Sequence, residues 1–276
     1  VLAGARARTE KKLAAQRAEL ADCARMDEYR RMGDLITSNL YKLKQGDTRV
    51  RLYDYGTERE VDVTLDGRLS PSKNAQRYYK KYAKAKHAQT VLTEQIALAE
   101  RELDYLSSVQ DAVSRAGSER DFAELRQELA LAGICGDARA SKSGKKGGRP
   151  APSKPLTFTL TSGRTVRVGK NNLQNDALTF GADKTDIWFH VKGFPGSHAV
   201  LFTGGAEPTD LDYTESAMLA AYHSKASGGV NVQVDYTPVR FVKKPAGAKP
   251  GYVIYDKYFT AVVRAELPDG VREEKK

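Results

Sequence analysis

Residues 70–116 read "SPSKNAQRYYKKYAKAKHAQTVLTEQIALAERELDYLSSVQDAVSRA", and they decide the first part of the fold. Ser70 is a favourable N-cap, and Pro71 suits the first helical position, where its missing N–H costs no hydrogen bond. Two interleaved rows then repeat every seven residues: Ala85, Leu92, Ala99, Leu106 and Val113, and Tyr82, Gln89, Ile96, Leu103 and Gln110. This pattern predicts one helix over 72–116, about 65 Å long, whose narrow stripe needs a partner helix.

The partner helix is expected to come from the same chain. Residues 9–44 carry an apolar stripe at helical spacing. Residues 49–55 and 59–65 each alternate apolar and polar residues and lie on either side of Gly56, which predicts a β-hairpin. The stripe consists of Tyr29, Met32, Ile36, Leu40 and Leu43. Two long helices that run antiparallel and are connected by a hairpin would make a coiled-coil arm over residues 1–135, with the hairpin as its tip at about 47–69. Pairing between two chains is the alternative that the sequence leaves open.

The rest of the chain predicts a linker and a second domain. Ser118, with Asp121 three residues later, begins a short helix that ends at Gly133. Residues 136–155 hold six basic residues, one acid and many Gly, Ser and Pro, which is typical of a flexible basic linker. Seven or so strands and one helix, over 214–227, follow within 156–276. The predicted fold class is therefore α+β, with a mainly antiparallel sheet in this domain.

Charge and cysteine content narrow the class of protein. The net charge of +10 indicates a polyanionic partner such as nucleic acid, although a solvated basic surface is the plainer explanation. Cys23 and Cys135 lack the spacing of a metal site or a disulfide framework, which fits the cytoplasm. No apolar run approaches the ~18 residues that span a bilayer, and because the first residues lack the charged and apolar regions of a secretory leader, we expect none. Because helical sequence begins almost at Val1, we expect a piece of a longer protein, and we expect no cofactor.

The segment "KTDIWFHVKGFPGSH", residues 184–198, concentrates reactive side chains. Successive side chains of a strand point to opposite faces, so Ile187, Phe189 and Val191 are expected to face the core. The opposite face then carries Asp186, Trp188, His190 and Lys192. The histidines have neither the spacing of metal ligands nor a nucleophile as partner, and a structural histidine is the plain alternative. An indole, an imidazole and an ammonium group on one face suit base stacking and phosphate contact. The predicted RNA-binding face comprises Trp188, His190, Lys192 and His198.

Three further clusters are candidates for RNA contact. Amides in "GKNNLQNDALTF" can read base edges or merely hold a turn: Lys170, Asn171, Asn172, Gln174 and Asn175. A Pro- and Gly-rich loop over 239–252 can approach phosphates: Arg240, Lys243, Lys244 and Lys249. On the arm, residues 76–87 form either a basic patch or a solvated helix face: Arg77, Lys80, Lys81 and Lys84. No Walker motif occurs, so nucleotide hydrolysis is unsupported.

Three stretches together resemble the RqcH/NEMF family of ribosome quality-control factors, whose bacterial members are often called fibronectin-binding protein A. They are "GKNNLQNDALTF" with "DIWFHVKGFPGSHAVL", "VDYTPVRFVKKPAGAKPGYVIY" and "SPSKNAQRYYKKYAKAK". The resemblance implies a coiled-coil middle domain and an NFACT-R-like domain over 156–276. It implies partners, namely the large ribosomal subunit, ribosomal RNA and peptidyl-tRNA, and support of C-terminal alanine tailing of stalled chains.

Two departures from the family pattern affect this expectation. The N-terminal domain and the helix-hairpin-helix segment that engage tRNA are absent, so the chain is expected to bind without elongating a tail. Near residues 180–183, "FGAD" is a residue shorter than the family's stretch and has a glycine where a basic side chain is expected. Phosphate contacts at that point are therefore in doubt.

The resulting hypothesis is a ribosome- and RNA-binding module rather than an enzyme. The alternatives are an adhesin that binds fibronectin, as the older family name suggests, and an RNA-processing enzyme that uses His190 or His198. Salt-sensitive binding to ribosomes would favour the RNA-binding module. Saturable binding to fibronectin that RNA does not affect would favour the adhesin. Loss of substrate turnover in His190→Ala would favour the enzyme.

Overall fold

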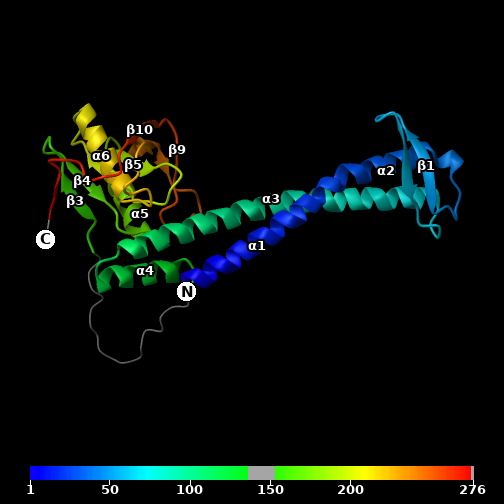
Figure 1. Cartoon of the computed structure of the whole chain (residues 1–276), viewed down its shortest axis with the longest axis horizontal. Helices are drawn as coiled ribbons and strands as arrows, with labels where there is room; N and C mark the ends of the chain where they lie inside the picture. Colours follow the sequence, from blue (N-terminus) through cyan, green and yellow to red (C-terminus); the bar gives the residue numbers. More distant parts are fainter. Residues whose placement is uncertain (136–152, 275–276) are drawn as a thin grey trace, which may run out of the picture. The chain divides into compact units, whose positions relative to one another are not determined.

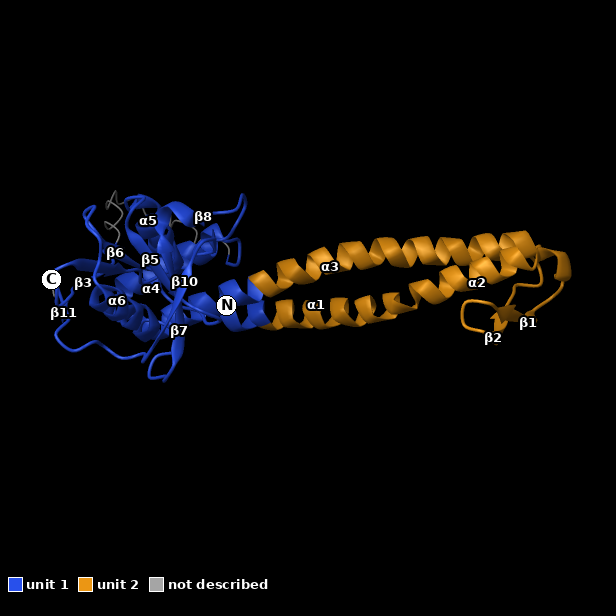
Figure 2. Ribbon diagram, turned by 90° about the horizontal axis from the view of Figure 1, so that it is seen from above, with its two compact units in different colours: residues 1–6, 102–276 blue, residues 7–101 orange. Residues whose placement is uncertain are grey.

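The computed structural model describes residues 1–135 and 153–274 (Figure 1), and these residues form two compact units. One unit comprises Val1–Arg6 and Glu102–Lys276, and the other comprises Ala7–Arg101 (Figure 2). Most of the predicted linker, residues 136–152, lies outside the described residues. Among the described residues, no helix is both long enough and apolar enough to cross a membrane.

Residues 7–101 contain the helices on either side of the hairpin. Helix α1 spans Leu2–Asp22, a 3-10 turn spans Cys23–Arg25, α2 spans Met26–Ser38, a second 3-10 turn spans Leu40–Lys42, and α3 spans Pro71–Arg115. Gln16 Nε2 donates to Gln95 Oε1 at 2.7 Å, and Tyr79 Oη donates to Asp34 Oδ1 at 2.7 Å. Since residue numbers rise along one side of these contacts and fall along the other, the helices pack antiparallel within one chain.

Two local features support the start of α3 and its packing against α2. Ser70 Oγ accepts a hydrogen bond from the backbone N of Lys73 at 3.4 Å, and Pro71 is the first helical residue, as the sequence predicts. In α2, a Cβ added at Gly33 would lie 2.9 Å from the ring of Tyr79. A side chain at position 33 would therefore force the two helices apart.

The hairpin lies between α2 and α3 in the chain. Strands β1 (Arg49–Asp54) and β2 (Arg59–Thr64) pair antiparallel, with Asp54 opposite Arg59. The predicted strands and turn are therefore confirmed. One face of the hairpin is buried with the helices in a small core: Met32, Leu35, Ile36, Leu43, Leu52, Val63, Leu65 and Ala75. This core holds the connection between the helices in a fixed structure.

The other unit contains the last turns of α3, helix α4 (Glu119–Leu131) and a sheet domain. The predicted capping box is present, because Ser118 Oγ accepts from the Asp121 backbone N at 3.2 Å and Asp121 accepts in return from the Ser118 backbone N. The end of α3 and α4 share a small core: Tyr105, Val109, Ala112, Leu125 and Leu129.

The sheet has seven strands in the order β10-β7-β5-β6-β4-β3-β11, and every neighbouring pair is antiparallel. The strands are β3 (Leu156–Thr159), β4 (Thr165–Val168), β5 (Ile187–Val191), β6 (Ala199–Phe202), β7 (Val232–Pro238), β10 (Phe259–Val263) and β11 (Arg272–Glu273). A 3-10 turn (Val239–Phe241) leads from β7 to a separate pair, β8 (Val242–Lys243) with β9 (Ile254–Tyr255). The α+β class is confirmed.

Both faces of this sheet are covered. Helix α6 (Asp210–Tyr222) packs on the face that carries Ile187, Phe189 and Val191, as alternation predicts. Trp188 on the opposite face joins a second core with Leu178 from helix α5 (Asn172–Gly181) and with Val242 from β8. The prediction of one helix in this domain is therefore wrong, because "NLQNDALTFG" forms α5.

Candidate nucleic-acid interface

The amides at 171–175 are occupied by internal hydrogen bonds. Asn171 caps α5 by accepting from the Gln174 backbone N at 2.9 Å, and its Nδ2 donates to Glu124 Oε2 at 2.9 Å. Asn172 donates to the buried Glu128 through Nδ2 at 2.8 Å and through its backbone N at 3.2 Å. Burial raises the pKa of the Glu128 carboxyl, and the bonds from Asn172 oppose that shift. These amides join α4 to α5.

The remaining three members of this cluster also contact the protein. Gln174 Nε2 donates to Glu124 Oε2 at 3.0 Å. The Asn175 Oδ1 accepts from the His198 backbone N at 3.1 Å, and Asn175 is buried. Lys170 Nζ lies 3.6 Å from Asp121 Oδ1. As the structure stands, the cluster presents no amide to a base edge, and an RNA role for it stays a prediction.

The predicted face of β5 is largely interior. The side chains of Trp188 and His198 are 0% and 2% exposed. His190 stacks on Trp188 with ring centroids 5.8 Å apart, and His198 Nδ1 lies 2.8 Å from Thr179 Oγ1. Burial lowers the pKa of His190 to about 4 and the pKa of His198 well below its usual value, so both imidazoles are neutral near pH 7. The expectation that Trp188 and His198 lie open to a ligand needs correction, because α5 and the β8–β9 pair cover them.

The basic loop divides into anchored and exposed cations. Lys244 is paired with Asp176 on α5, and Lys249 Nζ lies 3.3 Å from Glu102 Oε1 on α3. Lys243 is 66% exposed, with its Nζ 3.8 Å from Asp256. Lys244 and Lys249 therefore hold the loop in place, whereas Lys243 and Arg240 face solvent.

A cluster of cations and aromatic rings remains exposed on this unit. The Phe241 ring has the Arg240 guanidinium and the Lys257 ammonium each 5.0 Å from its centroid. The Arg240 backbone N donates to Lys184 O at 3.3 Å, which brings Lys184 alongside. Tyr258 is 45% exposed and lies under the Lys192 ammonium at 5.7 Å. We call this set the Arg240 surface: Lys184, Lys192, Arg240, Phe241, Lys257 and Tyr258.

The Arg240 surface is distinguished by several cations that gather around Phe241 beside an exposed tyrosine. Within the described residues, no ion pair involves Lys184, Arg240 or Lys257, and all three side chains are exposed. Lys192 keeps a partner, since its Nζ lies 3.9 Å from Asp235. Sequence reasoning found Arg240 and Lys192 and missed the others. The juxtaposition of charged and aromatic residues in "DKYF", 256–259, is the signal that could have found Lys257 and Tyr258.

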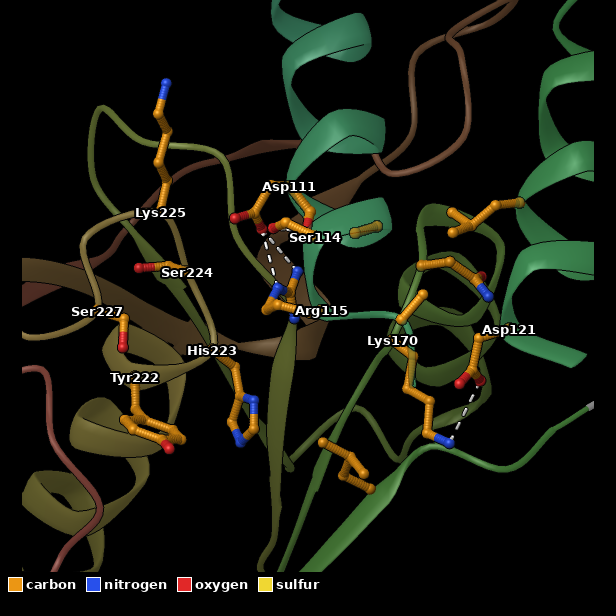
Figure 3. A pocket seen from close by; sticks show the side chains of 15 residues that line it. Asp111, Ser114, Arg115, Asp121, Lys170, Tyr222, His223, Ser224, Lys225 and Ser227 are labelled. Atoms are coloured by element: carbon orange, nitrogen blue, oxygen red, sulfur yellow. Dashed lines mark hydrogen bonds and ion pairs between the residues drawn. The ribbon is translucent and has the colours of Figure 1, made fainter. Parts of the chain in front are cut away.

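A cavity of about 640 Å³ lies beside the end of α3 (Figure 3). Arg115 enters it and is held by Asp111 Oδ2 at 2.7 Å and by Ser197 Oγ at 3.0 Å. Burial, reinforced by the charge of Arg115, lowers the pKa of His223 there to about 4. Over residues 1–135 and 153–274, no group of three or more potential metal ligands occurs. The cavity thus offers a neutral imidazole and a guanidinium already paired with a carboxylate.

The four predicted cations of the arm lie on or beside the first half of α3. Arg77 Nη1 is 3.4 Å from Asp66, and Lys81 Nζ lies 5.4 Å from the ring centroids of both Tyr29 and Tyr78. Lys80 and Lys84 are exposed.

Comparison with known proteins gives the family. Residues 1–147 match the family described as NFACT N-terminal and middle domains. The chain belongs to the NFACT family. This NFACT chain is 41% identical over 253 residues to the Rqc2 homolog RqcH of Bacillus subtilis (strain 168), covering 90% of this chain and 43% of that protein. The match to the Rqc2 homolog RqcH of Streptococcus suis (strain 05ZYH33) is 41% over 250 residues, covering 90% and 44%. The predicted resemblance to the RqcH/NEMF family is confirmed.

A solved structure shares the fold. It is the C-terminal of the fibronectin/fibrinogen-binding protein from Streptococcus suis (FBPS), with a TM-score of 0.74 and 35% sequence identity, covering 96% of this NFACT chain and 91% of that one. The chain spans less than half the length of the curated relatives it matches.

Proposed function

We propose that this chain is the ribosome- and RNA-binding portion of a ribosome-associated quality-control factor. Its relatives over 90% of its length are named as RqcH proteins, and it carries the Arg240 surface. In this proposal the protein binds obstructed large ribosomal subunits that carry peptidyl-tRNA. It supports C-terminal alanine tailing of the stalled chain as a binding module, without a catalytic step of its own.

The proposal assigns roles along the chain. Residues 1–135 act as a coiled-coil arm with the hairpin at 47–69 as its tip, and residues 156–276 act as the RNA-binding domain. The antiparallel contacts within 7–101 and the small core beneath the hairpin support the first assignment. The exposed cations of the Arg240 surface support the second.

The observation that carries the proposal is the set of unpaired cations around Phe241. A guanidinium and two ammonium groups without carboxylate partners are free to replace the counterions of several phosphates. Tyr258 beside them offers a partly exposed ring on which an unpaired base can stack, an interaction worth about 1–3 kcal/mol per base. Cations with an adjacent aromatic ring suit single-stranded segments of RNA, where bases are free to leave the helical stack.

Co-sedimentation with purified large ribosomal subunits, with and without peptidyl-tRNA, tests the proposal across a salt series. We expect saturable binding that falls steeply with salt and favours the peptidyl-tRNA complex. Arg240→Ala/Lys257→Ala removes two phosphate contacts and is expected to weaken binding about ten-fold near 100 mM salt. The matched control is Arg167→Ala/Arg264→Ala. It also removes two exposed cations, one of which lies over the Phe202 ring at 4.9 Å.

Equal effects of the two double variants would contradict the role of the Arg240 surface. Absence of binding to large subunits, together with saturable binding to fibronectin that RNA leaves unchanged, would contradict the proposed function itself.

A further inference from the structure

The first half of α3 lacks acidic residues altogether. Between Asp66 and Glu94 the chain carries seven Lys and Arg and no Asp or Glu. A solvated helix face usually mixes both signs of charge, because pairs of opposite charge three or four residues apart stabilise the helix. A long helical segment of a single sign indicates a polyanionic partner.

Four of these cations lie on one face of the helix. Lys73, Arg77, Lys80 and Lys84 are spaced by 4, 3 and 4 residues, so they follow each other along a single line. At about 100° per residue this line lies opposite Ala75, which is buried. At ~1.5 Å per residue the line is about 16 Å long. We call these four residues the α3 stripe.

The cations of the α3 stripe are available to a ligand. All four residues are exposed, and within the described part of the chain Lys73, Lys80 and Lys84 form no ion pair. Arg77 has one contact, 3.4 Å from Asp66, and stays 52% exposed. Arg68 is the main partner of Asp66 and holds the pKa of that carboxyl at about 2.

The tyrosines next to the stripe are already in use. Lys81 covers the Tyr78 ring, whose hydroxyl donates to Thr64 O at 2.7 Å. The hydroxyl of Tyr79 is bonded to Asp34, and the ring of Tyr82 lies under Lys86 at 5.8 Å. Because these three tyrosines are partly buried, unlike the exposed Tyr258, the stripe offers charge without base stacking. Its exposed face also lacks the large apolar residues that an amphipathic helix inserts into a membrane surface.

We propose that the α3 stripe binds the phosphate backbone of double-stranded RNA. A duplex hides its bases and presents closely spaced phosphates along a rigid axis, which matches a straight row of cations with no stacking platform. The inference rests on the proposed function only for the class of partner. The stripe belongs to residues 7–101, so it forms a second RNA contact that does not involve the Arg240 surface.

Fluorescence anisotropy with the whole chain tests the inference. The probes are a blunt RNA duplex of about 20 base pairs and an unstructured single strand of the same length. Salt is varied from about 50 to 200 mM. The test variant is Lys80→Ala/Lys84→Ala, which retains the helix because alanine has high helix propensity. The control is Lys11→Ala/Lys12→Ala, which removes the same charge from exposed positions on α1.

Two phosphate contacts contribute about 1.8 to the slope of log K against log salt for a duplex. We therefore expect the test variant to lower that slope by nearly 2 and to weaken duplex binding about ten-fold, with the control unchanged. A test variant that binds duplex as the control does would overturn the inference. So would loss of binding to phosphatidylserine vesicles with duplex binding intact, which would indicate a membrane-binding face.

The two RNA sites can fail separately. In one outcome, Arg240→Ala/Lys257→Ala binds both probes normally and Lys80→Ala/Lys84→Ala no longer binds the duplex. That result would support the role of the α3 stripe and contradict the role of the Arg240 surface. In the reverse pattern, Arg240→Ala/Lys257→Ala loses binding to the single strand and Lys80→Ala/Lys84→Ala binds both probes normally. That result would contradict the role of the α3 stripe and agree with the proposed function.

Discussion

Replacing Glu128 by alanine tests how strongly α4 is held against α5. The Glu128 side chain is 0% exposed and accepts two hydrogen bonds from Asn172, at 2.8 Å from Nδ2 and 3.2 Å from the backbone N. Without the carboxylate these two buried donors lose their acceptor, and each such loss costs about 1–3 kcal/mol. The raised pKa of Glu128 shows that burying its charge is itself unfavourable, which offsets part of the loss. We expect Glu128→Ala to lower the free energy of unfolding by about 2–4 kcal/mol.

Urea unfolding followed by tryptophan fluorescence measures this change. Trp188 is the only tryptophan and is fully buried in the sheet domain, so its emission reports unfolding of this unit. With a denaturant slope of about 2 kcal/mol per molar, the midpoint should fall by about 1–2 M. Gln127→Ala, at the exposed neighbouring position of the same helix, should leave the midpoint unchanged.

A midpoint for Glu128→Ala equal to that of Gln127→Ala would refute the reasoning, because it would mean that the buried donors find water or other acceptors. A double-mutant cycle with Asn172→Ala supplies the second check. The double variant should lose less stability than the sum of the single variants, since both changes remove the bond from Asn172 Nδ2 to Glu128 Oε1.

Three further predictions concern other parts of the chain. In α2, Gly33→Val should lower the melting temperature measured by circular dichroism, because a side chain meets Tyr79 at 2.9 Å and overpacking typically costs about 1–3 kcal/mol. The lowered pKa of His190 means that the fold disfavours its protonated form, so the contribution of this residue to stability should fall as pH drops below about 6.5 and become constant below about 4. His190→Gln should make the fall of the urea midpoint across that range less steep, with His198 and His223 keeping part of it, and an unchanged pH profile would contradict the assignment. Lys244→Ala should speed proteolysis of the 243–253 loop by breaking its pair with Asp176, while leaving RNA binding at the Arg240 surface intact.

Local sequence signals made the helices and the hairpin of residues 1–135 predictable. The hairpin follows from alternation around Gly56, and the start of α4 follows from Ser118 and Asp121, because each signal lies within a few residues of the structure it specifies. Helix α5 was missed because an asparagine that caps a helix and one that holds a turn look alike in sequence. Only the carboxylates of α4, more than forty residues earlier, show that Asn171 and Asn172 join α5 to that helix.

The candidate site was less predictable for a related reason. Alternation in β5 correctly groups Trp188 with His190, but it cannot show whether another layer covers their face. Phe241 and Lys257 meet because the chain turns back through β8 and β9, and no spacing between them in the sequence indicates that contact. Charge alone likewise could not separate Lys244, which anchors a loop, from Arg240, which faces solvent.

The alignment of α1 with α3 has a consequence for how this stretch of the gene can change. Gln16 and Arg17 meet Gln95 and Glu100 across the helix pair, although Gln16 and Gln95 are 79 residues apart in the chain. Seven residues inserted into one helix alone would displace its contacts by two turns, about 10 Å. Only an equal insertion in the opposite helix restores them. Insertions and deletions in relatives should therefore be inherited in matched pairs, one on each side of the hairpin.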